Sequence, residues 1–438
     1  MAINSQDIIN AIPKSAKTVY VAYSGGVDSH VLLHILAHST YRSQIVAVYI
    51  NHGLQSAADA WGHHCASVCE QLELSFLSIS VNVVRIAGES LEEAARNARY
   101  EAFKPLLAQG DVLLTAQHAD DQAETFLLQV LRGAGIAGLA SMPLQANFGA
   151  GLLLRPLLYF SRHDVLDYAT THQLAWVEDS SNQQDHFDRN YLRLHIMPLL
   201  RKRWPAVDKT ISRSAEHCAE AMDYLDAFAA LHLPNLLDSE NRFNCLILGE
   251  YAPKQQLLLI RHWLRSNGLK SPSQAVSEAI LNQLIYARAD AEPCISIQGY
   301  AIRRYRNKLY CLDSSALKLP ITTTQLWQTS HPELMLDNGH CLFAEPSSVG
   351  INAELWLTRE VTLKARQGGE RLRLPNRQGR HELKKLYQEA GIPPWERDLR
   401  PIIYLDGEIA AVAGLWVDAA FWAEEVDCIQ VKCCQQQN

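Results

Sequence analysis

The chain has 438 residues, 48% of them hydrophobic and 20% charged, which is enough for roughly three domains and unlike the composition of a disordered polypeptide. Its 40 Lys and Arg against 47 Asp and Glu give a formal charge of −7, so a basic coat over the whole surface is excluded and any nucleic-acid site must be local. Ten scattered cysteines, a polar N-terminal stretch and no apolar run near the ~20 residues of a membrane span predict a cytoplasmic protein that contacts no membrane.

Residues 1–215 predict alternating strands and helices. Short apolar, β-branched runs predict strands at 18–23, 45–50, 74–81 and 111–116, and helices are expected between them and at 161–175. This alternation is typical of an α/β domain with a parallel sheet covered by helices on both faces. In such domains ligands bind beyond the carboxyl ends of the strands, so the loops at 24–29, 51–54 and 118–121 are expected to open on one crevice.

The remainder predicts two further domains. Residues 216–312 are expected to form a helical middle domain that ends in a β-hairpin turning at Gly299, and the Thr-, Ser- and Pro-rich stretch at 313–350 predicts a linker. Residues 351–438 predict a small α+β domain. Its strands are expected at 355–360, 361–366, 402–407 and 408–417, around one helix near 380–390.

The loop after the first strand predicts a phosphate-binding turn. It consists of Ser24, Gly25, Gly26, Val27, Asp28 and Ser29. Unpaired N–H groups at the start of the following helix favour an anion there, and two glycines let the backbone approach it closely. The alternative is an ordinary Gly-rich turn with Asp28 or Ser29 as the helix N-cap. No Gly-Lys dipeptide of a Walker loop occurs, and the G-x-G-x-x-G string at 133–138 follows a helical segment where a dinucleotide site needs a strand.

The SGGVDS loop resembles the signature of the PP-loop ATP pyrophosphatases, and further motifs narrow the resemblance to the tRNA(Ile)-lysidine synthetase family. These motifs occur in order at 51–54 (NHGL), 93–96 (EAAR), 117–125 (QHADDQAET), 131–133 (LRG), 155–157 (RPL), 179–182 (DSSN), 189–193 (RNYLR), 368–371 (GGER), 384–386 (KKL) and 391–397 (GIPPWER). Gln117 stands where the family commonly has a second His. The resemblance covers nearly the whole chain.

This resemblance implies a ligase that joins L-lysine to C2 of the wobble cytidine, position 34, of the isoleucine tRNA with a CAU anticodon. ATP and Mg²⁺ would be used, an adenylated cytidine would be the intermediate, and AMP and pyrophosphate would be released. The product, lysidine, changes codon specificity from AUG to AUA. The resemblance also implies that the middle domain at 216–312 contacts tRNA and that the C-terminal domain at 351–438 binds tRNA.

The residues of the first domain can be matched to the two steps of that reaction. The loop at 24–29, together with Arg132, is expected to bind ATP and its pyrophosphate. Carboxylates are the ligands that Mg²⁺ prefers, which suggests Asp28, Asp120 and Asp121, although an acidic pair at a helix N-terminus needs no metal. A lysine amine titrates near 10.4 and needs a general base, for which Glu124, His118 and Asp121 are the alternatives. The expected nucleotide or tRNA contacts of this domain are Arg96, Arg155, Arg189 and Arg193.

A basic stretch near the C-terminus predicts a tRNA-binding surface. Between Arg359 and Arg400 there are eleven Lys and Arg against six Asp and Glu, a local charge of +5, with aromatic residues interleaved. The expected contacts are Arg371, Lys384, Lys385 and Arg397. The alternative is a solvated charged face without a ligand.

Two other functions compete with lysidine formation. The first is another PP-loop enzyme: thiolases with an iron–sulfur cluster use C-x-x-C pairs, absent here, and amidotransferases need a nucleophile such as an N-terminal Cys, where Ala2 follows Met1. The second is a non-catalytic, nucleotide-gated tRNA-binding protein. The cluster His63, His64, Cys65 and Cys69 is interpreted as part of a helix with buried thiols and not as a zinc site. Whether the chain acts as a homodimer stays open.

Overall fold

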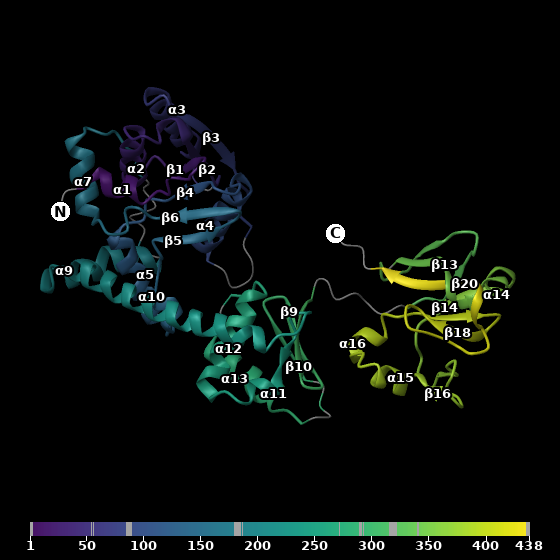
Figure 1. Cartoon of the computed structure of the whole chain (residues 1–438). Helices are drawn as coiled ribbons and strands as arrows, with labels where there is room; N and C mark the ends of the chain where they lie inside the picture. Colours follow the sequence, from purple (N-terminus) through teal and green to yellow (C-terminus); the bar gives the residue numbers. More distant parts are fainter. Residues whose placement is uncertain are drawn as a thin grey trace. The chain divides into compact units, whose positions relative to one another are not determined.

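The computed structural model describes residues 3–53, 55, 57–84, 90–178, 185, 187–270, 272–288, 291, 293–314, 322–339 and 341–434. The chain separates into two compact units, Met1–Phe228 and Ala229–Asn438 (Figure 1). The DSSN motif at 179–182 and Leu54 of the NHGL motif lie outside the described residues. No helix within the described ranges is long and apolar enough to cross a membrane.

The first unit is built on a six-stranded sheet. Its strands are β1 Val19–Ala22, β2 Ile45–Asn51, β3 Ser75–Ser80, β4 Val112–Leu114, β5 Gln145–Phe148 and β6 Gly151–Leu154, in the order β3-β2-β1-β4-β6-β5. All neighbours are parallel except β5, which runs antiparallel to β6. The strand order reverses between β1 and β4, and this switch point is where ligands bind in open α/β sheets.

Helices cover both faces of this sheet, as predicted. They are α1 Ser5–Asn10, α2 Val27–Ala37, α3 Ala58–Gln71, α4 Leu91–Phe103 and α7 Arg162–Thr171. Because side chains alternate along a strand, Val21 and Ala47 join the core formed with α1, α2, α3 and α7. Val48 and Leu113 point to the other face and pack with Phe103 of α4. The predicted α/β architecture is therefore confirmed.

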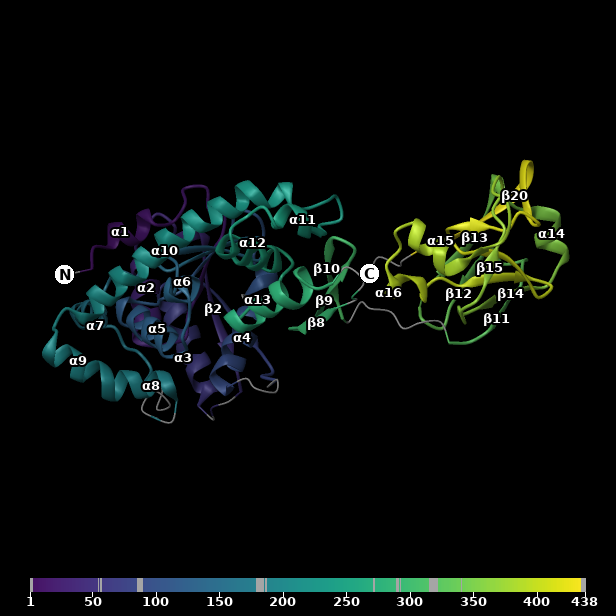
Figure 2. The same ribbon diagram turned by 90° about the horizontal axis from the view of Figure 1, so that it is seen from below.

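A group of helices packs beside the carboxyl edge of the sheet. It comprises α5 Ala119–Leu131, α6 Ile136–Leu139, α8 Asp188–Tyr191, the π-helical turn η4 Leu192–Ile196, α9 Met197–Arg203 and α10 Val207–His232. Ala123, Met197 and Val207 form a small buried cluster that joins α5 to α9 and α10. Figure 2 shows the chain reversing direction between α9 and α10.

The second unit begins with a helical and β-sheet region. Its elements are β7 Phe243–Asn244, α11 Cys245–Leu248, α12 Pro253–Ser266, α13 Gln274–Ala279, the π-helical η6 Ile280–Ile285, β8 Cys294–Ile297, β9 Tyr300–Tyr305 and β10 Lys308–Asp313. The expected turn at Gly299 joins β8 to β9, and a second turn at 306–307 adds β10, so that the hairpin is part of a sheet ordered β7-β10-β9-β8.

Short 3₁₀ helices occur in both units, at Arg42–Gln44 and Lys104–Leu106 in the first and at Leu233–Asn235 in the second.

The last part of the unit contains antiparallel sheets and short helices. Its elements are β11 Gln325–Trp327, β12 Glu333–Met335, β13 Cys341–Asn352, α14 Ala353–Thr358, β14 Val361–Lys364, β15 Arg371–Leu372, β16 His381–Glu382, α15 Leu383–Glu389, α16 Pro394–Arg397, β17 Ile402–Leu405, β18 Glu408–Val412, β19 Trp416–Val417 and β20 Trp422–Cys434. Two expectations differ from this result. Strands β11, β12 and most of β13 occupy the stretch expected to be a linker. β11 pairs with β14 and β13 with β20, both farther along the chain, and β12 pairs with β13.

The other difference is α14, which replaces the strand expected at 355–360. Asn352 accepts a hydrogen bond from the Leu355 backbone N–H through its side chain, which caps a helix at this point. Trp356 is thereby buried against Trp327, with ring centroids 5.2 Å apart. The apolar run LWLT thus belongs to a short helix that buries Trp356 and leaves Leu357 exposed, and a short apolar run does not distinguish such a helix from a strand.

Candidate active site

The loop at 24–29 folds into a turn with its amides directed at the start of α2. Ser29 closes the turn: its Oγ donates to the Gly26 carbonyl at 2.9 Å and accepts from the Ser24 N–H at 3.2 Å. Gly26 is the N-cap of α2 and has no side chain with which to cap the helix. The first N–H groups of α2, including that of Val27, therefore have no partner in the helix and form a site for an anion.

Gly25 is required at its position for two reasons. Its φ of +81° lies in the left-handed region that side chains disfavour. A Cβ added there would lie 3.1 Å from the Sγ atom of Cys65, which is buried on α3. Cys65 thus forms the packing wall behind the loop, and burial raises its pKa to about 12, which keeps the thiol protonated.

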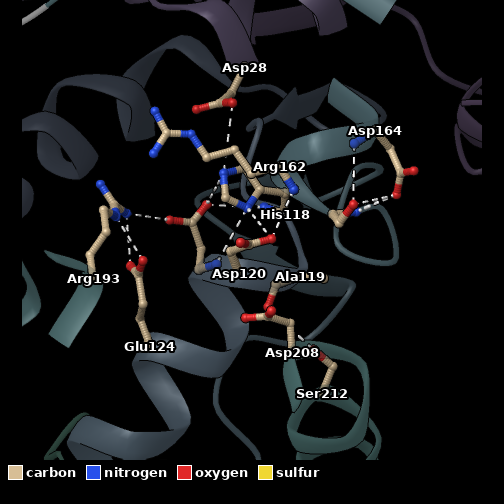
Figure 3. A network of polar contacts seen from close by, with 12 residues as sticks. Asp28, His118, Ala119, Asp120, Glu124, Arg162, Asp164, Arg193, Asp208 and Ser212 are labelled. Carbon is tan, nitrogen blue, oxygen red and sulfur yellow. Dashed lines mark hydrogen bonds and ion pairs between the residues drawn. The ribbon is translucent and has the colours of Figure 1, made fainter. Parts of the chain in front are cut away.

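Asp28 lies on the first turn of α2 and has an unused acceptor atom. Its side chain is 35% exposed, but the Oδ1 atom is buried and has no hydrogen-bond partner among the described residues. The His118 Nε2 atom lies 3.7 Å from it. Burial raises the pKa of Asp28 above its ordinary value, and the neighbouring His118 opposes that rise. Figure 3 shows Asp28 facing His118 and Arg162 across the site.

His118 and Asp121 form a reciprocal cap at the start of α5, directly after β4. The Asp121 N–H donates to His118 Nδ1 at 3.4 Å, and the His118 N–H donates to Asp121 Oδ2 at 3.1 Å. The other ring nitrogen of His118, Nε2, lies 3.4 Å from Asp121 Oδ2 and 3.7 Å from Asp28 Oδ1, so one buried imidazole faces two carboxylates.

Two arginines neutralise Asp121 and Glu124. Glu124 is 1% exposed and receives two N–H groups from Arg193, at 2.7 and 2.8 Å (Figure 3), and one from Arg189 at 2.9 Å. Both arginines also donate to Asp121 Oδ1, at 2.8 and 3.2 Å. Burial disfavours the charged form of Asp121, but His118 and the two arginines outweigh it and hold its pKa below the ordinary value.

Asp120, like Asp121, has a hydrogen-bond partner at both of its oxygens. Oδ1 accepts from the Arg162 backbone N–H at 2.8 Å, and Oδ2 accepts from Arg201 Nη2 at 2.5 Å. Arg201 also forms two hydrogen bonds with Asp208, at 2.7 and 2.8 Å. Asp120 therefore joins the start of α5 to α7, α9 and α10, and a metal ion would have to compete with these bonds.

The other predicted residues of the first unit lie apart from this network. Arg155 follows β6, is 5% exposed and donates to the Pro143 carbonyl at 2.7 Å. Burial lowers its pKa, and its hydrogen bond with Tyr100 opposes that shift. Arg96 lies over the Tyr100 ring at 5.6 Å, so these residues form a separate cationic group. Arg132 is exposed at the C-terminal end of α5, about 18 Å along the helix axis from Asp120.

In the second unit, only part of the basic stretch is free at the surface. Lys384 and Lys385 are exposed on α15, and Arg371 is exposed but lies 3.6 Å from Glu382. Arg397 is 6% exposed and donates to the Ile392 carbonyl at 2.9 Å and to the Tyr305 hydroxyl at 3.2 Å. These bonds make Arg397 a packing residue in this structure, whereas the two lysines are free to meet a ligand.

Three residues of the network were not predicted from the sequence: Arg162, Arg201 and Asp208. Each lies on a helix remote in sequence from its partner, and no motif marks it. Within the described part of the chain, no three His, Cys, Asp or Glu side chains form a group that could hold a metal ion by themselves. Cys65 and Cys69 are free and buried, as the interpretation of that helix required.

Comparison with known proteins identifies all three parts of the chain. Residues 1–200 match the family model of the PP-loop domain, residues 245–310 that of the TilS substrate binding domain, and residues 361–433 that of the TilS substrate C-terminal domain. A tRNA(Ile)-lysidine synthase of Methylococcus capsulatus is 41% identical over 95% of this chain and 96% of its own length. One of Coxiella burnetii is 41% identical over 92% of this chain and 90% of its own. The chain belongs to the tRNA(Ile)-lysidine synthase family.

Proposed function

We propose that this chain forms lysidine in tRNA(Ile) by joining the ε-amine of L-lysine to C2 of cytidine 34 in the CAU anticodon. ATP is consumed, an adenylated cytidine is the intermediate, and AMP and pyrophosphate are released. The product decodes AUA in place of AUG. The observation that carries the proposal is the PP-loop and the carboxylate network at one sheet edge, in a chain of this family. We assign the reaction to the cytoplasm, where tRNA, ATP and lysine occur together.

In the first half-reaction the base O2 attacks the α-phosphorus of ATP, and pyrophosphate leaves. The free N–H groups at the start of α2 and the Ser24 hydroxyl are placed to hold the leaving pyrophosphate. Gly26 leaves that surface open because it has no side chain.

The donor set at Asp28 fits Mg²⁺. Its Oδ1 is a hard oxygen ligand that lacks a partner among the described residues, and Mg²⁺ binds through one or two carboxylates together with waters and substrate phosphates. When bound, Mg²⁺ supplies positive charge to the phosphates. Asp28 is the primary candidate ligand. Asp120 and Asp121 are secondary candidates, because both oxygens of each are already hydrogen-bonded and each would have to exchange an arginine side chain for the metal ion.

In the second half-reaction the lysine amine attacks C2 and must lose a proton. We assign the base to Glu124, because it accepts hydrogen bonds from the side chains of Arg189 and Arg193. It can exchange these partners without undoing the helix, whereas Asp121 and His118 also cap the start of α5. His118 then orients Asp28 and Asp121.

The test is AMP formation by the purified chain with ATP, Mg²⁺ and the CAU-anticodon tRNA, with and without lysine. We expect pyrophosphate release that requires tRNA, AMP release that also requires lysine, and loss of both after chelation of Mg²⁺. AMP formation independent of lysine would contradict the proposal. Nucleotide binding without any turnover would favour a non-catalytic, nucleotide-gated tRNA-binding protein instead.

A further inference from the structure

The segment from α8 to α9 presents two chemically different faces. The inner face carries Arg189, Arg193 and Arg201, whose guanidinium groups are paired with carboxylates of α5. The opposite face is exposed and includes Leu199, 67% exposed, and Lys202. The arginines of the inner face therefore hold the segment against α5, whereas the side chains of the outer face are exposed.

The corner between α9 and α10 concentrates positive charge. Lys202, Arg203, Lys209 and Arg213 are all exposed, and none forms an ion pair with a residue that the structure describes. Lys202 directly follows Arg201, and Lys209 directly follows Asp208, so the Arg201–Asp208 hydrogen bonds fix both ends of the corner to each other. Asp208, in the first turn of α10, is paired with Arg201, and the other acidic side chains of α10 come later, from Glu216 onward.

An aromatic ring lies within this charged corner. Trp204 is 56% exposed, although a Trp side chain usually gains more from burial. The Arg203 guanidinium lies 5.4 Å from the centre of its ring. A free aromatic face beside unpaired cations is the combination that binds single-stranded nucleic acid, because bases stack on the ring while cations contact phosphates.

We propose that the α9–α10 corner, formed by Lys202, Arg203, Trp204, Lys209 and Arg213, is an RNA-binding surface that grips the substrate tRNA close to the catalytic network. The inference rests on the proposed function and adds a second grip, in the first unit, to the one expected in the C-terminal region. A polyanion fits this surface better than a second copy of the chain does. The second copy would present 40 Lys and Arg together with its 47 Asp and Glu, whereas every phosphate of an RNA is negative. Arg201 links the corner to Asp120, so RNA bound there lies next to the start of α5.

The first experiment compares two variants that lose the same charge. Lys202→Gln/Arg203→Gln removes two cations from the corner, and Lys14→Gln/Lys17→Gln removes two exposed cations elsewhere in the same unit. Binding of the CAU-anticodon tRNA is measured by titration over a series of salt concentrations. We expect the corner variant to bind about tenfold more weakly and to lower the slope of log K against log salt by about 0.7–0.9 per lost contact. The control should bind like the wild type.

The second experiment addresses Trp204 with the isolated anticodon stem-loop as probe. Trp204→Ala should weaken binding by about 5- to 100-fold, as expected for loss of one stacked base, and Trp204→Phe should restore most of it. If Lys202→Gln/Arg203→Gln fails to fold, Lys209→Gln/Arg213→Gln serves as the second charge variant.

Binding is read without turnover, so the outcomes separate the two proposals. Wild-type affinity and salt slope in the corner variants would overturn the RNA-binding surface even if lysidine is formed. A change of oligomeric state with unchanged tRNA affinity would assign the surface to a second copy and also overturn it. Weakened tRNA binding in a chain that makes no lysidine would leave the surface standing and refute the proposed function.

Discussion

The carboxylate network around α5 and the basic stretch at 359–400 are both rich in charged residues, but their charges are held differently. In the network, Glu124 is 1% exposed and its hydrogen bonds cross about 65 residues of sequence. In the basic stretch, pairs such as Arg377 with Glu389 are local and exposed. A buried charge therefore acts through specific partners, whereas a surface charge acts through a field that salt screens.

The largest effect is expected at Asp28. Asp28→Asn keeps the size of the side chain and removes the charge, so pyrophosphate release should fall by at least about 10²-fold while the fold is retained. The measurement is tRNA-dependent pyrophosphate release, with circular dichroism as the control for folding. Release at the wild-type rate would remove Asp28 from the metal site.

A large effect with a different signature is expected at Glu124. Glu124→Gln should keep pyrophosphate release and accumulate adenylated tRNA, because only the second half-reaction needs the base. It also leaves Asp121 as the remaining carboxylate partner of Arg189 and Arg193, and the loss of the Glu124 charge should cost up to about 3 kcal/mol of stability. Mass spectrometry of the tRNA measures the intermediate. If adenylation and lysine transfer fall together, Glu124 acts on ATP or its metal ion.

An intermediate effect is expected at Arg201, which was not predicted from the sequence. Arg201→Met leaves Asp120 with one hydrogen bond and should lower the free energy of unfolding by about 1–3 kcal/mol. Arg201→Lys should retain part of that stability. Thermal denaturation checks both variants, and an unchanged midpoint for Arg201→Met would show that the Asp120–Arg201–Asp208 link does not stabilise the fold.

A smaller effect separates the members of the basic stretch. Lys384→Gln and Lys385→Gln should each lower the salt slope of tRNA binding by about one unit without changing stability. Arg397→Gln should lower the stability and leave the salt slope unchanged, because the Arg397 guanidinium donates hydrogen bonds to Ile392 and Tyr305 inside the unit. A lowered salt slope for Arg397→Gln at unchanged stability would return this residue to the tRNA contacts expected from the sequence.

The smallest effect concerns the pKa values of two carboxyls, measured by NMR titration at low and at 1 M salt. Arg377 lowers the pKa of Glu389 at the surface, and His118 with the arginines lowers that of Asp121 against its burial. At about 1 M salt, with a Debye length of ~3 Å, Glu389 should move back up and Asp121 should stay low. A carboxyl whose pKa is lowered by folding stabilises the folded state at pH values above its ordinary pKa. This contribution to stability is lost as the pH falls through the pKa of the folded state. At high salt, only the contribution of Asp121 should remain.

The sequence predicts strands β1 to β4, the PP-loop and the residues that follow β1 and β4, because a short motif beside an apolar run depends on local chain geometry. Arg201 escapes this reasoning, since its partner Asp120 lies more than 80 residues away, and Asp208 enters the network only through Arg201. The strands at 325–352 escape it for the same reason: β11 pairs with β14, and β13, which also pairs with β12, pairs with β20. The burial of Arg397 depends on Tyr305 and could not be predicted from local charge.

We infer that one sheet edge carries out both steps of lysine ligation to cytidine. The most direct test is mass spectrometry of the anticodon cytidine after the wild-type chain has been incubated with the CAU-anticodon tRNA, ATP, Mg²⁺ and isotopically labelled L-lysine. We expect a cytidine that has gained one labelled lysine. A cytidine that stays unmodified or only adenylated, while ATP is hydrolysed to AMP, would contradict it.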